Sequence, residues 1–189
     1  LVVSRRGLVL ALMNAVYFGS VFVGALLAQF WFPPSYEGSL EVSGIFPVEW
    51  GLHAVVLSVF LFNLLLTAFL FTTLSGLVFF VLPMAVLVWR AVVWGFLLSG
   101  LPTPLFLIAL PTFVLEGEGY VIASVAGIVL GLSWLKPKLV YIEEDLSRLE
   151  AFKRAVNEAG RIYVLVAVIL FVAAVVETMT LFLFYWKTS

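Results

Sequence analysis

The stretch LPTPLFLIALPTFVLEGE, residues 101–118, decides how this chain folds. It is almost entirely apolar, yet three prolines interrupt it and it contains two glutamates near its end. Proline removes a backbone donor and disfavours a helix interior, while the apolar side chains disfavour a free loop in water. Such a backbone is stable at membrane depth only where protein or trapped water satisfies its amides. The segment therefore indicates a fold embedded in a membrane.

The composition of the whole chain indicates the same environment. Of 189 residues, 64% are apolar and 11% are charged, and the mean hydropathy is +1.21. A soluble domain has about a quarter of its residues charged, and a core this small cannot hide so much apolar surface. A soluble fold is excluded, and the lipid bilayer is the main partner. The net charge of −1 gives no basic footprint for nucleic acid, and the lack of cysteine excludes disulfides and thiolate zinc sites.

Stretches without charge predict an all-α integral membrane protein with five transmembrane helices. A helix needs about 20 mainly apolar residues to cross about 30 Å of hydrocarbon. The stretch 50–89 is long enough for two such helices, and the small polar residues at 72–76 are expected to turn the chain between them. The predicted spans of this single membrane domain (1–189) lie at about 8–32, 52–72, 77–99, 118–135 and 162–186.

The basic residues predict how these spans are oriented, because short loops rich in Lys and Arg stay in the cytoplasm. Eight of the ten basic residues lie before the first span or in the connection 136–161, whereas the loop 33–49 has three glutamates and no basic residue. We expect a multi-pass protein of the cell membrane. Its N-terminus and the 136–161 connection are predicted to be cytoplasmic and its C-terminus extracellular.

The residues left between the third and fourth spans predict one shorter element. The 72–76 turn and the 136–161 connection are both expected in the cytoplasm, so the segment between them crosses the membrane an even number of times. Two spans leave residues 101–118 over. We expect a short outer-leaflet re-entrant helix at 103–115. The alternative is one long kinked helix with shifted boundaries.

The 136–161 connection predicts a cytoplasmic amphipathic helix. Its apolar residues recur at intervals of three and four, which places them on one helical face; they are Ile142, Leu146, Leu149, Phe152 and Val156. Basic residues flank this stripe, as anionic lipid favours. We therefore expect the helix to lie on the membrane surface, with a specific partner protein as the alternative.

Four ionisable side chains and one asparagine predict an intramembrane polar site. At about 1.5 Å per residue, Arg90 lies about 20 Å and Glu177 about 23 Å from the inner ends of their spans. Glu116 and Glu118 begin a span that descends from the outside, and Asn63 lies near mid-depth in the second span. The four charges therefore converge in the outer half of the membrane. Such charges are costly in lipid and usually face a partner or a cavity.

Two interpretations of this polar site remain open. In the first, Arg90 pairs with Glu177 or Glu116 and fixes the order of the helices, while Glu118 meets water at the lipid headgroups. In the second, one cation against three carboxylates leaves a negative charge that a proton, a cation or water must balance, as in transport or ion coupling. Asn63 is more typical of a hydrogen bond to a neighbouring helix than of a substrate ligand.

A ladder of small residues predicts close helix packing in the fourth span. Ala123, Gly127 and Gly131 are spaced four apart, and such ladders let two helices approach closely. The neighbour is either another helix of the same chain, which is the commoner case, or the same helix of a second copy in a homodimer.

The sequence shows no evident catalytic centre, metal site or cofactor site. His53 is the only histidine, and a single histidine is a weak signal for a metal. Residues 143–148 spell an acidic pattern that CAAX-type intramembrane proteases use, but they lie outside any predicted span. No nucleophile is evidently paired with a base. We therefore expect no enzyme activity, no metal and no cofactor.

Three stretches of the chain carry a family resemblance. They are FLFNLLLTAFL around Asn63, LPTFVLEGEGYVIASVAG (110–127) and VAAVVETMTLF (172–182). Together they resemble the stage II sporulation protein M family in its archaeal-type short form. That family has an F-x-N-N-like element, a Pro-His-Gly-x-x-Glu-like element that opens a helix, and A-A-x-x-E near the outer end of its last helix.

The resemblance assigns individual residues to these family elements. Asn63 falls on the first element, Glu116 on the glutamate of the second and Glu177 on the glutamate of the last helix. The chain departs from the family pattern with Thr112 where a histidine is usual and with Leu64 in place of the second asparagine.

The resemblance also implies a class of function. In spore-forming bacteria the family member is similar to an anchor for peptidoglycan-degrading partners, but relatives occur in organisms that neither sporulate nor make peptidoglycan. We expect a non-enzymatic membrane scaffold or assembly factor with a membrane or envelope protein partner. The alternative is a small transporter or channel subunit, because broken helices beside intramembrane charges are typical of transporters.

The orientation can be tested by single-cysteine labelling, because the chain has no cysteine of its own. A cysteine at position 145 should react with a membrane-impermeant reagent only after the cells are opened, whereas a cysteine in the 33–49 loop should react on intact cells. Labelling of position 145 from outside intact cells would contradict the predicted orientation.

Overall fold

The structure is a computed structural model that describes residues 2–31, 51–101, 103–142 and 144–188, with no side-chain description at 2–6 and 183–188. Over these ranges the chain is helical and contains no strand, which confirms the all-α prediction. The predicted extracellular loop at 33–49 lies outside the described residues. The elements are α1 (Val2–Trp31), α2 (Leu52–Leu61), η3 (Phe62–Thr73), α3 (Ser75–Val78), α4 (Leu82–Ser99), α5 (Thr103–Leu135), α6 (Pro137–Val140) and α7 (Arg148–Thr188).

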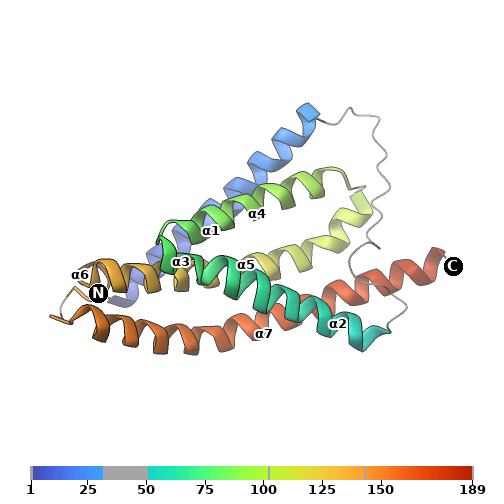
Figure 1. The fold of residues 1–189 in the computed structure, drawn as a ribbon. Helices are drawn as coiled ribbons and strands as arrows, with labels where there is room; N and C mark the ends of the chain where they lie inside the picture. Colours follow the sequence, from blue (N-terminus) through green and yellow to red (C-terminus); the bar gives the residue numbers. More distant parts are fainter. Residues whose placement is uncertain (1, 32–50, 102, 143, 189) are drawn as a thin grey trace.

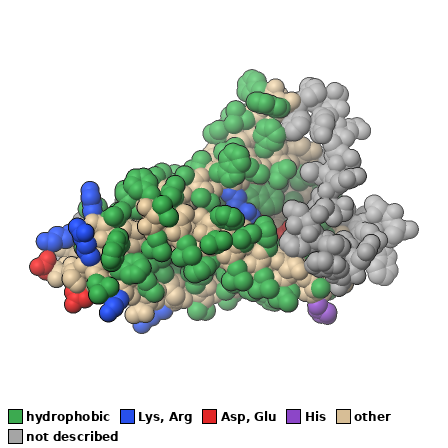
Figure 2. Space-filling model, viewed as in Figure 1, with side chains coloured by type: hydrophobic (Ala, Val, Ile, Leu, Met, Phe, Trp, Pro, Cys, Tyr) green, Lys and Arg blue, Asp and Glu red, His purple; other side chains and the backbone are tan. Residues whose placement is uncertain are grey.

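Five helical segments of the described chain are long and apolar enough to cross a membrane, as the sequence predicted. They are Gly7–Trp31, Leu52–Val78, Leu82–Ser99, Thr103–Leu135 and Arg148–Phe182. The N-terminus and α6 lie at one end of the bundle and the C-terminus at the other (Figure 1). Lys and Arg side chains gather at the end with α6, which we call the basic end (Figure 2).

The central helix of the bundle is α5, which is the most buried of the five. It packs against α7 on one side and against α4, η3 and α3 on others, while α1 packs mainly on α4. The core around it is formed by buried side chains from five elements, including Tyr17, Ala68, Leu87, Ala91, Phe113, Tyr120, Val121, Val166 and Leu170. Most side chains at the middle of α5 therefore face protein rather than lipid.

The small-residue ladder of α5 packs within the chain. A β-carbon at Gly127 would meet Pro83 and the backbone of Thr73, and one at Gly131 would collide with the backbone of Gly76. Ala123 is fully buried, and its carbonyl accepts a hydrogen bond of 2.9 Å from the Thr73 hydroxyl. The sequence allowed the ladder to pack either on another helix of the same chain or on a second copy. In the structure it packs on another helix of the same chain.

The chain turns at residues 79–81, so the predicted turn at 72–76 is wrong. Thr72 and Thr73 are buried, and their hydroxyls donate to the carbonyls of Thr67 and Ala123. A β-carbon at Gly76 would collide with the backbone of Gly127 on α5. These small polar residues therefore serve helix packing, and the helical segment continues to Val78.

The structure contains one continuous helix where the sequence predicted two. Because α5 runs from Thr103 to Leu135, the predicted separation of a re-entrant helix at 103–115 from a span at 118–135 is wrong. Pro104 lies in the first turn, where the backbone N–H has no helical partner in any case. That leaves Pro111 inside the helix, and membrane helices tolerate an interior proline because neighbouring groups satisfy the freed backbone.

The predicted amphipathic helix is not a separate element. Ile142 and Leu146 precede α7, which starts at Arg148 and continues without a break into the last span. A capping box starts the helix, since Ser147 and Glu150 exchange side-chain to backbone hydrogen bonds. In the first turns of α7 the alanines at 151, 155 and 159 are buried on one helix face. The last two pack near Ala126 and Leu130 of α5. The predicted stripe is left largely exposed, and its contact with the membrane surface stays a prediction.

The close contact between α3 and α5 gives a stability prediction. In Gly76→Ala the new β-carbon would meet the backbone of Gly127, so the two helices must separate. Overpacking of this kind costs about 1–3 kcal/mol, and we expect a lower midpoint of thermal unfolding for the full-length chain in detergent. Gly160→Ala is the matched control, because a β-carbon there meets nothing within 4 Å. Equal midpoints for the two variants would contradict the packing described here.

Candidate functional site

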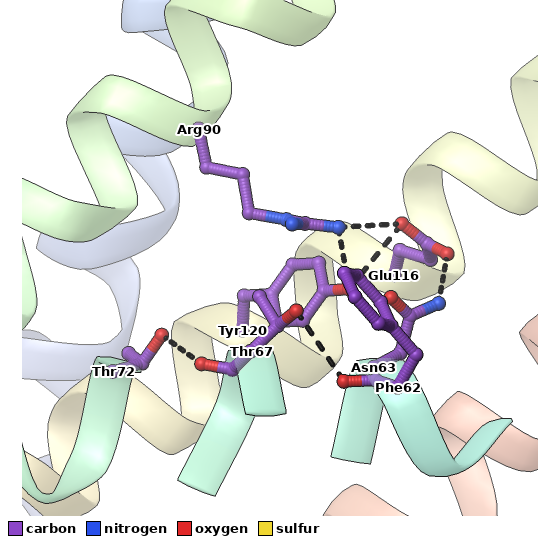
Figure 3. Close-up of polar contacts among 7 residues, drawn as sticks. All are labelled: Phe62, Asn63, Thr67, Thr72, Arg90, Glu116 and Tyr120. Carbon is purple, nitrogen blue, oxygen red and sulfur yellow. Dashed lines mark hydrogen bonds and ion pairs between the residues drawn. The ribbon is translucent and has the colours of Figure 1, made fainter. Parts of the chain in front are cut away.

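A buried carboxylate at the middle of the bundle is the centre of the polar site. Glu116 of α5 is only 2% exposed. Its Oε1 accepts a hydrogen bond of 2.6 Å from Nδ2 of Asn63. Its Oε2 lies 3.4 Å from a terminal nitrogen of Arg90 and 3.5 Å from the hydroxyl of Tyr120 (Figure 3). Both oxygens are therefore occupied by donors from η3, α4 and α5.

Tyr120 holds the guanidinium of Arg90 in place. The same Arg90 nitrogen donates to the Tyr120 hydroxyl at 2.7 Å, and the guanidinium carbon lies 4.2 Å from the centre of the tyrosine ring. The Arg90 side chain is 25% exposed, whereas that of Glu116 is 3% exposed. Figure 2 shows Lys or Arg atoms within the otherwise apolar middle of the bundle. The pair therefore joins a buried anion to a cation that reaches the surface of the bundle.

A π-helix positions Asn63 toward this carboxylate. η3 covers twelve residues, and a π-helix turns more widely than an α-helix because its bonds span five residues instead of four. The hydroxyls of Thr67 and Thr72 donate to carbonyls five residues earlier, at 3.5 and 2.8 Å (Figure 3). Wide turns of this kind are rare and are frequent at functional sites.

Glu177 of α7 contributes the second carboxyl group and contacts that of Glu116. The two helices are antiparallel, and Gly119 of α5 lies against Leu170 of α7. Side chains lean toward the N-terminus of their own helix, so Glu116 and Glu177 lean toward each other across this interface. Within the described residues, the Oε2 atom of Glu177 is buried without a hydrogen-bond partner.

The structure brings together four of the five predicted site residues. Asn63, Arg90 and Glu177 all surround Glu116, and the direct ion pair of Arg90 is with Glu116. Glu118 is two residues further along α5 and therefore lies on a different face of the helix. It is partly exposed, and no described side chain pairs with it in the cluster.

Two tyrosines at the site were missed from the sequence. Tyr120 follows Glu116 by four residues, and this spacing places both side chains on one helix face. Tyr17 of α1 is fully buried, stacks on Phe113 at 5.7 Å and would touch a β-carbon at Gly117. The spacing from Glu116 was a usable signal for Tyr120, whereas nothing in the sequence distinguishes Tyr17 from an interfacial aromatic residue.

The described residues contain no group of three His, Asp or Glu side chains that could hold a metal ion. His53 lies exposed on α2, in a shallow apolar groove with Val175 and Met179 of α7. The polar site itself has hydrogen-bond donors from Asn63, Arg90 and Tyr120 directed at one carboxylate. Its geometry is that of a charge held inside a bundle by several helices.

The chain matches a known protein family over most of its length. Residues 8–180 match the family model described as stage II sporulation protein M. The chain belongs to this family. Curated proteins and solved structures gave no match.

Membership in the stage II sporulation protein M family agrees with the resemblance on which the site residues were first chosen. The three positions that the resemblance assigned, Asn63, Glu116 and Glu177, come from η3, α5 and α7 and meet in one cluster. Thr112, which stands where the resemblance places a histidine, is 4% exposed, and its hydroxyl has no partner among the described residues.

The ion pair between Arg90 and Glu116 should contribute more to stability than an exposed ion pair does, and this can be tested. Arg90→Ala leaves the Glu116 charge uncompensated in the bundle, and losing one partner of a buried pair costs about 3–5 kcal/mol. Adding Glu116→Gln to Arg90→Ala should recover part of this loss. A double-mutant cycle on the unfolding free energy of the full-length chain measures the coupling.

Arg154 supplies the control for this cycle. It pairs with Glu158 at 3.2 Å at the exposed start of α7, where such pairs are worth about 1 kcal/mol or less. Arg154→Ala should therefore change stability little. Purely additive losses for Arg90→Ala and Glu116→Gln would show that the buried pair is not coupled.

Proposed function

We propose that this protein is a non-enzymatic membrane scaffold that pairs with a second copy of itself through α1 and offers the paired bundle to a membrane or envelope protein partner. The observation that supports a scaffold is the convergence of donors on Glu116. Asn63, Arg90 and Tyr120 all donate to this one carboxylate. Because these donors already bind a group of the same chain, the arrangement is suited to fixing the helices rather than to binding a substrate.

A second set of polar contacts between helices supports the same interpretation, and it lies closer to the basic end than Glu116 does. We call this set and the Glu116 cluster the two polar ties. The hydroxyl of Tyr163 on α7 donates to the Ala68 carbonyl at 2.9 Å and contacts the Thr73 hydroxyl, which also donates to Ala123 of α5. Together the two ties join η3, α4, α5 and α7. A bundle with such ties is suited to presenting a fixed surface.

The helix outside these ties is α1. Its described side chains make hydrogen bonds only within the helix, and it is the least buried of the five spans. Its face toward the bundle includes Met13, Tyr17 and Gly24. The opposite face shows a small residue at every fourth position, and all of these are exposed: Gly7, Ala11, Ala15 and Gly19.

This exposed face favours another transmembrane helix as the partner. In lipid, helices associate where small residues let their backbones approach closely. A β-carbon at Gly7 or Gly19 would meet nothing within 4 Å in the single chain. The same stripe on a second copy in the same membrane orientation is self-complementary, which a two-fold symmetric interface requires.

The self-association can be tested with one bulky substitution and one control. Gly19→Leu should prevent the close approach of two copies of α1, at a cost of about 1–3 kcal/mol, which is a loss of about five- to 150-fold in association. Co-purification of differently tagged copies from a membrane preparation measures it. Leu27→Phe adds bulk to an exposed part of α1 outside the stripe and should leave association unchanged. Equal association for both variants and the parent chain would contradict the proposed pairing.

A small transporter or channel subunit is the second candidate function, with its polar site in the outer half of the membrane. The observation that favours it is the set of buried polar atoms that have no partner among the described residues. The Nε of Arg90 and the Oε2 of Glu177 are two of them. Intramembrane charges of this kind mark ion pathways in many transporters.

A further inference from the structure

The contact between two carboxyl groups inside the bundle requires a proton. The carboxyl groups of Glu116 and Glu177 lie beside each other across the α5–α7 interface, as the contact of Gly119 with Leu170 and the lean of both side chains require. An ionised carboxylate has only acceptor oxygens, so a hydrogen bond between two carboxyl groups forms only when one of them carries an O–H. Two carboxylates that share one site cannot both be ionised without a large penalty.

The donors around the pair indicate which carboxyl group carries that proton. Both oxygens of Glu116 accept from donors, namely Asn63 on one side and Arg90 with Tyr120 on the other. This environment stabilises the ionised form of Glu116. Glu177 receives no comparable donors from the described residues, and its Oε2 is buried without a partner. Glu177 is therefore the group that is better satisfied as a neutral acid donating to Glu116.

The charge balance of the surroundings leads to the same assignment. The titratable groups close enough to interact electrostatically with Glu177 are Glu116 and Tyr120 of α5 and Arg90 of α4, while α2 presents His53 in the exposed groove beside Val175. Arg90 and ionised Glu116 already neutralise each other. A charged Glu177 would leave one uncompensated negative charge in a medium of low dielectric constant, which is costly.

From this geometry we propose that Glu116 and Glu177 form a proton-binding site in which Glu177 holds an exchangeable proton and donates it to the carboxylate of Glu116. The site stands independently of the proposed scaffold role. When the proton leaves, the O–H bond of Glu177 breaks, the proton passes to water, and a second carboxylate remains beside the first.

Buried hydroxyl groups lie at the level of Glu177. The α5–α7 register places Thr112 about opposite Glu177, since Gly119 lies against Leu170 seven residues away on each helix. Thr112 and Thr178 are 4% and 0% exposed, and their hydroxyls have no partner among the described residues. This level of the interface therefore offers polar atoms to an arriving water or proton.

The experiment uses the full-length chain in lipid nanodiscs and two readouts. The first is the infrared carbonyl band of a protonated carboxylic acid, recorded while the pH is raised. The second is the midpoint of thermal unfolding over the same pH range. We expect the parent chain to show the acid band at neutral pH and to lose both the band and stability as the pH rises, because deprotonation creates an uncompensated charge.

The variants assign the proton to one residue. Glu177→Gln keeps a neutral donor in the same place, so it should remove the acid band, retain the stability of the parent chain and abolish the loss of stability at alkaline pH. Glu116→Gln leaves Arg90 without its anion and should lower stability at every pH. Glu118→Gln is the matched control, on the same helix but outside the cluster, and should change neither readout.

Three results would overturn the proposal. The first is an acid band that persists in Glu177→Gln and disappears in Glu116→Gln, because the proton would then belong to Glu116. The second is the absence of a carboxylic acid band from the parent chain at every pH. The third is stabilisation by added sodium ions that depends on Glu177 and occurs without any acid band, which would make a monovalent cation the charge-balancing occupant. None of these results depends on whether two copies pair through α1.

Discussion

A carboxylate buried inside a membrane bundle must obtain its donors from neighbouring helices, and this constraint fixes much of the structure. Glu116 lies on the central helix and is contacted from η3, α4 and α7. Each contact sets the register of one helix against α5, because a shift by one residue would move the donor about 1.5 Å along the axis and turn it away. The apolar surfaces, which pack in many registers, cannot specify this arrangement alone.

The sequence predicted the spans and most of the cluster for physical reasons. Span length follows from the thickness of the bilayer, and the depth of Arg90, Glu116 and Glu177 follows from a fixed rise per residue. Depth alone does not tell which faces meet. The sequence therefore allowed Arg90 to pair with either glutamate, whereas the structure pairs it with Glu116. It also placed Glu118 in the cluster, although a residue two positions away lies on another helix face.

The errors in predicting the fold from the sequence come from residue types that occur in two kinds of structure. The threonines and the glycine at 72–76 are typical of a turn. In lipid, the same residue types also let helices approach closely and form hydrogen bonds with each other. Here they make such contacts with α5. Proline reads as a helix break, but in the first turn of α5 it costs no hydrogen bond. The same ambiguity applies to small-residue stripes, since the ladder at Gly127 packs within the chain while the stripe on α1 faces outward.

Two glutamates in one cluster need not share one role, because their surroundings differ. Glu116 is surrounded by donors that hold it as an anion, and in that state it joins the helices. Glu177 lies beside the same anion, but its Oε2 has no partner among the described residues, so its charge is the one that the surroundings penalise. Enzymes separate two carboxyl groups into an acid and an anion by the same difference in environment. A bundle can therefore remain rigid through one carboxylate while the other exchanges a proton. Any such exchange would act on the α5–α7 interface, where α7 contributes both Tyr163 and Glu177 to the polar contacts between helices.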